Sequence, residues 1–138
     1  MSFWTGRYVL VTGAQGLIGA PLCKALLDEG AYVTGYDTSL RGLLTEYGLT
    51  KRMQFIKDTI LSGSRLAAAM VNQEVVFHLA AISGVEHARS AQADAFEVNV
   101  RGTWLVLQAA LETAGVKAVV VASSNHIYGF QDGDGPFS

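Results

Sequence analysis

The chain has 138 residues, enough for one domain, and half of them are hydrophobic, so it can bury a core. Its net charge of -2 gives no electrostatic case for a nucleic-acid partner or an anionic membrane surface. No apolar run reaches the roughly 18 residues needed to cross a bilayer, and the opening MSFWTGRY lacks a signal-peptide pattern. The single cysteine, Cys23, has no partner for an internal disulfide, so a reducing, cytoplasmic setting is expected.

Strand and helix patterns alternate along the chain. Strands are predicted over 8–12, 32–36, 53–56, 75–79 and 117–122. Helices are predicted over 17–29, 64–71 and 91–114, with room for a short one within 38–50. Gly30 and Gly115 stand where two of these helices should end. Runs of β-branched residues are typical of parallel strands covered on both faces. We therefore expect a doubly wound α/β sheet with strand order 3-2-1-4-5, forming one domain over residues 1–138.

Three glycines, Gly13, Gly16 and Gly19, follow the first strand at once. The first allows a tight turn, the second lets the backbone approach a pyrophosphate, and the third lets the helix pack close to the strand. The helix N-terminus would then offer N–H groups and its positive dipole end to phosphates. A purely structural turn is the alternative. Because Asp37 follows 18 residues after Gly19, at the end of the next strand, the pattern favours a dinucleotide-binding βαβ unit.

Two acidic residues follow predicted strands. Asp37 can accept hydrogen bonds from both hydroxyls of an adenosine ribose and would repel a 2′-phosphate, which favours NAD over NADP. The alternatives are an ordinary solvated aspartate and a phosphate held by the nearby Arg41. Asp58 follows the third strand, where a contact with the adenine amino group and a plain surface acid are equally good interpretations.

The glycine spacing is Gly-x-x-Gly-x-x-Gly, and it is accompanied by VVFHLAA (75–81), NVRGTW (99–104) and VVVASSNHIYG (119–129). In this combination the chain resembles the extended short-chain dehydrogenase/reductase family, which includes the NAD-dependent sugar-nucleotide epimerases and dehydratases. The resemblance runs from the first strand to just beyond the fifth. It implies a Rossmann sheet, NAD as cofactor, a sugar or nucleotide-sugar substrate in the complete protein, and a homodimer formed through helix 91–114.

The resemblance also implies individual roles. The pyrophosphate would be wrapped by Gly13, Gln15, Gly16, Leu17, Ile18 and Gly19. The adenosine would be held by Asp37 at the ribose and, around the adenine, by Asp58 with Thr59 or Ile60. The groove for the rest of the cofactor would be lined by Leu79, Ala80, Ala81, Ala122 and Ser123. Asn99 would support the active-site backbone, and Ser124 would hydrogen-bond the substrate oxygen beside the nicotinamide.

For Ser123 and Ser124 the plainer interpretation is two polar residues that end a strand. His78 lies within an apolar strand and is expected to be a buried, hydrogen-bonded core residue. His87 and His126 come nearer the expected cleft, but two isolated histidines do not make a metal site, so no metal is expected.

The chemistry of this family needs a Tyr-x-x-x-Lys pair, whose tyrosine moves a proton while the cofactor takes or gives a hydride. The sequence has 14 residues after Ser124 and no such pair among them. Tyr47 and Lys51 match the spacing but fall between the second and third strands, on the adenosine side, which indicates coincidence. The chain is therefore expected to be the cofactor-binding part of a longer enzyme, inactive alone and with one sheet edge unpaired. A non-catalytic NAD-binding module and a Rossmann-like domain without a dinucleotide are the alternatives.

The residues after Ser124 bear on the type of reaction. Asn125 and His126 stand where related dehydratases carry an acid, which weakens a dehydratase assignment and leaves epimerase and dehydrogenase open. The run Ser-Ser-Asn-His also resembles uronate dehydrogenase-like members, although four residues do not decide the reaction.

Overall fold

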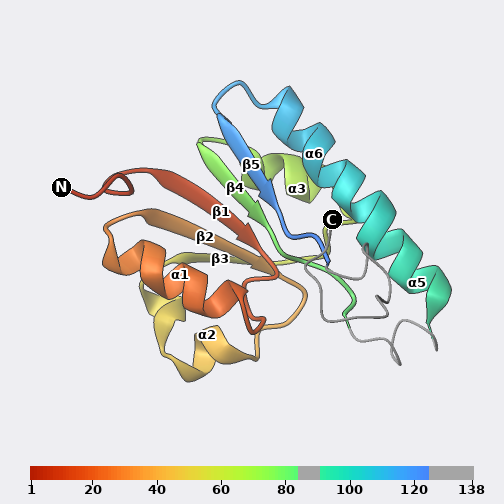
Figure 1. Ribbon diagram of the computed structural model, residues 1–138, viewed down its shortest axis with the longest axis horizontal. Helices are drawn as coiled ribbons and strands as arrows, with labels where there is room; N and C mark the ends of the chain where they lie inside the picture. Colours follow the sequence, from red (N-terminus) through yellow and green to blue (C-terminus); the bar gives the residue numbers. More distant parts are fainter. Residues whose placement is uncertain (84–90, 125–138) are drawn as a thin grey trace, which may run out of the picture.

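A five-stranded parallel sheet forms the centre of the protein, whose computed structural model describes residues 1–83 and 91–124 (Figure 1). The strands are β1 (Tyr8–Thr12), β2 (Tyr32–Asp37), β3 (Gln54–Lys57), β4 (Val75–His78) and β5 (Ala118–Val121). Their order, β3-β2-β1-β4-β5, confirms the predicted topology. Because every pairing is parallel, the carboxyl ends of the strands gather at one edge, where ligands bind in sheets of this kind.

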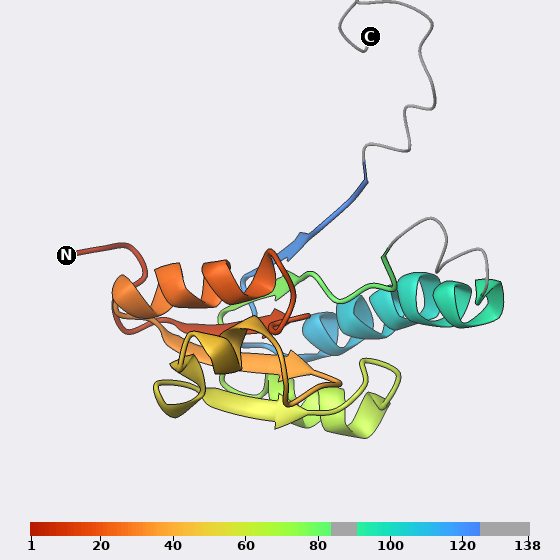
Figure 2. The same ribbon diagram turned by 90° about the horizontal axis from the view of Figure 1, so that it is seen from below.

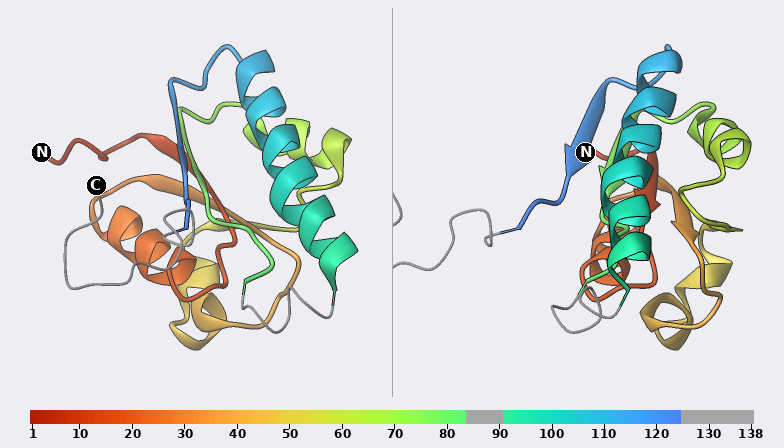
Figure 3. Two further views of the ribbon diagram at one scale, coloured as in Figure 1. Left: turned by 45° about the vertical axis from the view of Figure 1, so that its right-hand side comes forward. Right: turned by 90° about the vertical axis from the view of Figure 1, so that its right-hand side faces the viewer.

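The connecting helices lie close to their predicted places. They are α1 (Gly19–Asp28), α2 (Leu43–Glu46), the 3₁₀ turn η1 (Leu49–Lys51), α3 (Gly63–Met70), α5 (Gln92–Phe96), the π-helical segment η2 (Glu97–Gly102) and α6 (Thr103–Glu112). The last three run on as one rod beside the sheet, so the long predicted helix exists but contains a π-helical segment (Figure 3). Within the described residues, no helix has the length and apolarity needed to span a membrane.

Helices cover both faces of the sheet, as the doubly wound prediction requires (Figure 2). Successive strand residues point to opposite faces, so each strand supplies two separate cores. On one face the core contains Val9, Val11, Ala20, Cys23 and Leu26, from β1 and α1. On the other it contains Leu10, Val76, Leu66, Met70, Val106 and Ala110, from β1, β4, α3 and α6. The two cores hold β1 rigidly and thereby fix the position of the turn that follows it.

Helix α1 begins two residues later than predicted, and this changes which of its residues are buried. The prediction began the helix at residue 17, but Leu17 and Ile18 lie outside it and are 83% and 67% exposed. The physical reason is a tight turn in which Gly16 N donates to Gly13 O at 3.1 Å. This turn occupies the residues before Gly19, so the helix starts there and the two apolar side chains project into solvent.

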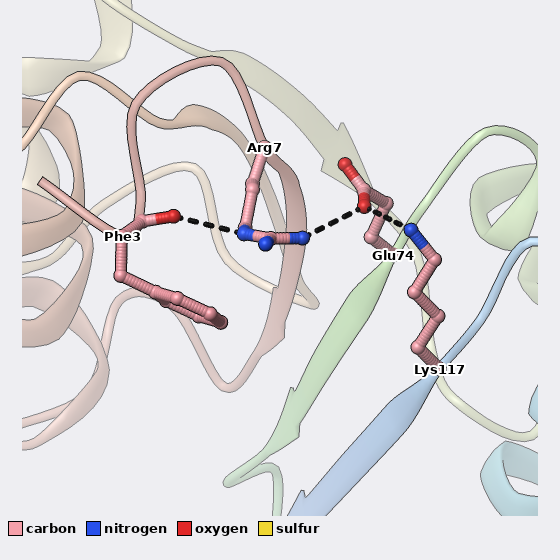
Figure 4. A network of polar contacts seen from close by, with 4 residues as sticks. All are labelled: Phe3, Arg7, Glu74 and Lys117. Carbon is pink, nitrogen blue, oxygen red and sulfur yellow. Dashed lines mark hydrogen bonds and ion pairs between the residues drawn. The ribbon is translucent and has the colours of Figure 1, made fainter. Parts of the chain in front are cut away.

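A polar network joins the amino ends of β1, β4 and β5, at the edge opposite the glycine turn (Figure 4). Arg7 Nε donates to Phe3 O at 2.8 Å, and its Nη1 donates to Glu74 Oε2 at 3.0 Å. Lys117 Nζ donates to the same Glu74 oxygen at 2.6 Å. The Lys117 hydrogen bond and the two positive charges hold the pKa of Glu74 below its ordinary value. The network ties the N-terminal segment to three strands and leaves the other edge free for a ligand.

Candidate cofactor site

A cleft of about 270 Å³ opens at the carboxyl edge of the sheet. Its walls are Gly13, Tyr36, Asp37, Thr38, Asp58, Thr59, Ile60, Ala80, Ala81, Ile82 and Val98. They come from the ends of β1, β2, β3 and β4 and from η2, so the structure brings together residues far apart in sequence. Pockets for small ligands typically hold about 300–1,000 Å³. The enclosed part therefore suits one half of a dinucleotide, with the remainder extending along the open edge.

The glycine turn is the tightest part of the site. Gly13 has a φ of +69°, and a Cβ there would lie 2.8 Å from the backbone of Leu79 and Ala80. A Cβ on Gly19 would overlap the carbonyl oxygen of Gly13. At Gly16 it would meet only that oxygen, at 3.2 Å, and otherwise face open space. Two of the glycines are thus needed for the turn itself, whereas the third leaves the backbone accessible from outside.

The N-terminus of α1 lies directly beyond this turn. No side chain caps this helix end, and residues 16–18, which lead into the helix, are exposed. The N–H groups at the start of a helix, together with the positive end of its dipole, attract anions such as phosphates. The accessible backbone of the turn and the uncapped helix end therefore form a phosphate-sized site next to the cleft.

Asp37 stands at the end of β2 and is held by two backbone N–H groups. Its Oδ2 accepts from Gln15 N and its Oδ1 accepts from Ser39 N, each at 3.0 Å. A carboxylate has about four lone-pair positions, so two remain after these bonds. The anchored side chain lines the cleft and keeps one free acceptor position on each oxygen, which matches a pair of vicinal hydroxyl groups.

Gln15 lies in the glycine turn, but its side chain faces α2. Its Oε1 accepts from Leu44 N at 3.0 Å, and its Nε2 donates to Thr45 Oγ1 at 3.2 Å. The side chain is 7% exposed and does not line the cleft. Its contribution to the site in this structure is the backbone N–H that anchors Asp37, together with its hold on the loop after β2.

Asp58, Thr59 and Ile60 form the wall beyond β3. Asp58 Oδ1 accepts from Thr59 N at 2.8 Å, and its Oδ2 lies 3.4 Å from Arg65 Nε. Tyr36 donates its hydroxyl to Thr59 O at 3.1 Å, and burial together with the Asp58 charge raises the pKa of Tyr36 to about 12. The tyrosine therefore stays a neutral hydrogen-bond donor that fixes this wall.

The opposite wall is the segment that follows β4. Thr12 Oγ1 accepts from Leu79 N and Ala80 N, each at 3.2 Å. The side-chain amide of Asn99 forms two hydrogen bonds with the backbone of Ile82. Its Oδ1 accepts from Ile82 N at 2.8 Å, and its Nδ2 donates to Ile82 O at 3.0 Å. Asn99 thus holds the backbone of this segment through two hydrogen bonds.

The predicted residues after β5 lie outside the cleft lining. Ala122, Ser123 and Ser124 are exposed, and Ala122 N donates to His78 O at 3.0 Å, which continues the ladder between β4 and β5. Predictions that concern His87, Asn125, His126 and the Tyr-Gly pair at 128–129 fall outside the described residues. No group of three metal-ligating side chains occurs in the described parts of the chain.

Four residues that line the cleft were not predicted from the sequence, namely Tyr36, Thr38, Ile82 and Val98. Two of them, Tyr36 and Thr38, flank Asp37, and this position beside a predicted ribose contact could have indicated that they line the cleft. Ile82 and Val98 lie on the loop after β4 and on η2. The hydrogen bonds between Asn99 and Ile82 join these two segments, and no local pattern marks them.

A parallel sheet in this order, with a glycine turn after β1 and an acid after β2, defines a Rossmann dinucleotide-binding fold. A family model, described as the NAD dependent epimerase/dehydratase family, matches residues 9–138, and the chain belongs to that family.

Individual relatives and solved structures are consistent with this family assignment. A UDP-N-acetyl-alpha-D-glucosaminuronate decarboxylase from Bacillus cytotoxicus is 37% identical over 130 residues, covering 94% of this chain and 39% of the relative. An epimerase structure from Methanothermobacter thermautotrophicus superposes with a TM-score of 0.87 at 29% identity, covering 98% of this chain and 40% of that one. A UDP-glucose-4-epimerase from Stenotrophomonas maltophila, with bound NAD and formylated UDP-arabinopyranose, gives a TM-score of 0.82 at 29% identity and 92% and 40% coverage. The chain spans about two fifths of the length of the relatives it matches.

Proposed function

We propose that this chain binds NAD in the cleft and over the glycine turn, with the adenosine enclosed and the nicotinamide directed toward β5. The observation that carries the proposal is the pairing of an accessible, uncapped turn at Gly16 with an anchored carboxylate at Asp37. Their chemistry fits the two ends of an adenosine diphosphate group, namely a pyrophosphate and a ribose diol. NADP fits less well, because its 2′-phosphate would face the Asp37 charge.

Each wall of the cleft has a function in this proposal. The Asp37 carboxylate accepts the ribose hydroxyls, and the N–H groups of the turn donate to the pyrophosphate. Asp58 accepts from the adenine amino group, flanked by Thr59 and Ile60. Ala80 and Ala81 line the opposite wall, where their small side chains leave room for the cofactor.

In the whole protein we propose oxidation or epimerisation at a sugar carbinol, with a nucleotide sugar as the substrate class. NAD would supply the chemistry by accepting a hydride from the carbinol carbon, which it keeps in an oxidation and returns in an epimerisation. Ser124, close after β5, donates a hydrogen bond to the reacting oxygen, and Ser123 supports it. Because the chain spans about two fifths of its relatives, we place the proton-moving tyrosine–lysine pair and the sugar-binding residues in further sequence of a longer protein. The 138 residues alone should bind NAD without turnover.

A footprinting experiment tests where the cofactor binds. Hydrogen–deuterium exchange with and without saturating NAD should show protection at 13–19, 37–39, 58–60 and 79–82. The amino ends of β1 and β2, around Tyr8 and Tyr32, lie at the far edge and serve as an internal control that should not change. Protection confined to that far edge, or none in a chain that binds NAD, would contradict the placement.

We further propose that two copies associate through the long helix. Five apolar side chains on α5, η2 and α6 are 43–83% exposed and recur every three or four residues, namely Phe96, Val100, Trp104, Leu107 and Leu111. This spacing places them on one side of a helix, where a second helix of the same kind can pack against them. The opposite side of the rod is buried, since Val106 and Ala109 pack in the core with residues of α3 and the sheet, and Gly102 packs against Ile60.

The substitution Trp104→Glu should convert the dimer to a monomer, because it puts a charge in the centre of the apolar stripe. Light scattering after size-exclusion chromatography measures the change. Ser64→Glu adds the same charge at an exposed position in the first turn of α3 and should leave the dimer intact. A wild-type chain that is monomeric at high concentration would contradict the dimer proposal, and it would not bear on the proposal that the chain binds NAD.

A further inference from the structure

His78, the last residue of β4, lies at the junction of two elements that support the cleft. It is 3% exposed, which confirms the predicted core position. Its Nδ1 lies 2.7 Å from Thr12 Oγ1, and its Nε2 lies 2.9 Å from Thr103 Oγ1. The ring therefore bridges the end of β1 and the start of α6, and both ring nitrogens have partners.

The direction of each hydrogen bond in this chain follows from its neighbours. Thr103 Oγ1 lies 2.8 Å from Asn99 O, and a carbonyl only accepts, so the Thr103 hydroxyl donates there. Thr103 must then accept from His78 Nε2–H. At the other end Thr12 Oγ1 accepts from two backbone N–H groups, so its own hydrogen is free to reach His78 Nδ1.

Both ends thus require the same neutral tautomer, with the proton on Nε2. Burial lowers the pKa of His78 below its ordinary value, which favours that neutral form. A protonated ring would present a second donor to Thr12 Oγ1, which already accepts two bonds. The network is therefore complete only with one proton on the imidazole.

The two threonines connected by His78 belong to the two anchors of the same wall. Thr12 holds the amides of Leu79 and Ala80 at the start of the 79–82 segment. Thr103 holds the backbone oxygen of Asn99, whose side chain grips the end of that segment. We propose that His78 is a positioning residue: as the Nε2–H tautomer it couples these anchors and keeps the 79–82 wall in the shape that receives the cofactor. The effect on binding rests on the proposed function, whereas the coupling itself does not.

Two measurements on the unliganded chain test the coupling. Long-range ¹⁵N–¹H NMR of the imidazole should show the Nε2–H tautomer, and the Nδ1–H form would overturn the proposal. In Thr103→Val, which removes the hydroxyl at nearly constant size, the Ile82 amide should exchange about tenfold faster, although the Thr103 hydroxyl bonds to His78 and Asn99 and not to Ile82 itself. Thr34→Val is the control, because it makes the same change at a buried threonine of β2 whose hydroxyl bonds to the side chains of Gln54 and Gln73 rather than to the His78 chain. Equal Ile82 exchange in both variants would overturn the coupling.

NAD affinity then tests the consequence. Thr103→Val and His78→Phe should each weaken NAD binding about tenfold, with the double variant no weaker than the worse single one, because both break one chain of bonds. His78→Gln, whose amide carries both a donor and an acceptor, should recover part of the loss. A folded His78→Phe variant that binds NAD as tightly as the wild type would overturn the positioning role. If the wild type binds no NAD, the proposed function fails, and Ile82 exchange still decides the coupling.

Discussion

Replacing Gly19 by alanine should remove NAD binding and lower the stability of the fold together. The added Cβ would overlap the Gly13 carbonyl oxygen, which is backbone and cannot move without shifting the turn. Forced overpacking of this kind typically costs about 1–3 kcal/mol. The helix N-terminus would have to move away from β1, so the turn could no longer hold a pyrophosphate. Thermal unfolding and calorimetric titration with NAD measure the two effects.

Substitutions at two further glycines distinguish an effect on the stability of the fold from an effect on NAD binding. Gly16→Ala should lose most NAD affinity with little loss of stability, since its Cβ meets only one oxygen, at 3.2 Å, and otherwise projects where the pyrophosphate is proposed to lie. Gly63→Ala should change neither, because nothing lies within 4 Å of its added Cβ. If Gly16→Ala binds NAD normally, the phosphate does not lie over this turn.

Replacing Asp37 by alanine should weaken NAD binding by about 100-fold or more and reduce the discrimination against NADP. Hydrogen bonds to a charged group contribute about 1.5–3 kcal/mol each, and two are proposed between this carboxylate and the ribose. The same change removes the negative charge that would repel a 2′-phosphate, so NADP affinity should fall much less. Titrations with both nucleotides give the ratio directly.

Asp37→Asn distinguishes charge from geometry. The amide keeps one oxygen acceptor for the turn or the ribose, so NAD binding should lie between that of the wild type and that of the alanine variant. Because the charge is gone, NADP discrimination should fall as far as it does in Asp37→Ala. A wild-type preference for NADP, or a ratio that Asp37 does not affect, would reject the proposed ribose contact.

The sheet and the position of the cleft could be read from sequence because they depend on strong local patterns. Short, mainly apolar runs such as 75–79 have few alternatives to a covered parallel strand, and parallel connections are nearly always right-handed. Once the strand order is set, Gly13, Asp37 and Asp58 must meet at one edge, since each follows a strand. The sequence also indicated that His78 is a core residue, because it interrupts an otherwise apolar strand.

Other details depend on tertiary contacts that no window of sequence contains. Leu17 and Ile18 fit a helical apolar face, yet the Gly13–Gly16 turn takes their place and leaves them exposed. The Gln15 side chain turns to α2 because Leu44 N donates to it and Thr45 Oγ1 accepts from it, 29 and 30 residues away in sequence. The π-helical segment η2 lies where Gly102 packs against Ile60, a close contact in which a Cβ would lie 2.5 Å from the isoleucine.

Calorimetric titration of the unmodified chain with NAD and with NADP is the most direct test of the central claim. The site described here predicts one NAD bound per chain, with NADP at least about tenfold weaker, the factor that corresponds to about 1.4 kcal/mol. Circular dichroism on the same sample establishes that the chain is folded. A folded chain that binds neither nucleotide, or that binds NADP as tightly as NAD, would contradict the account.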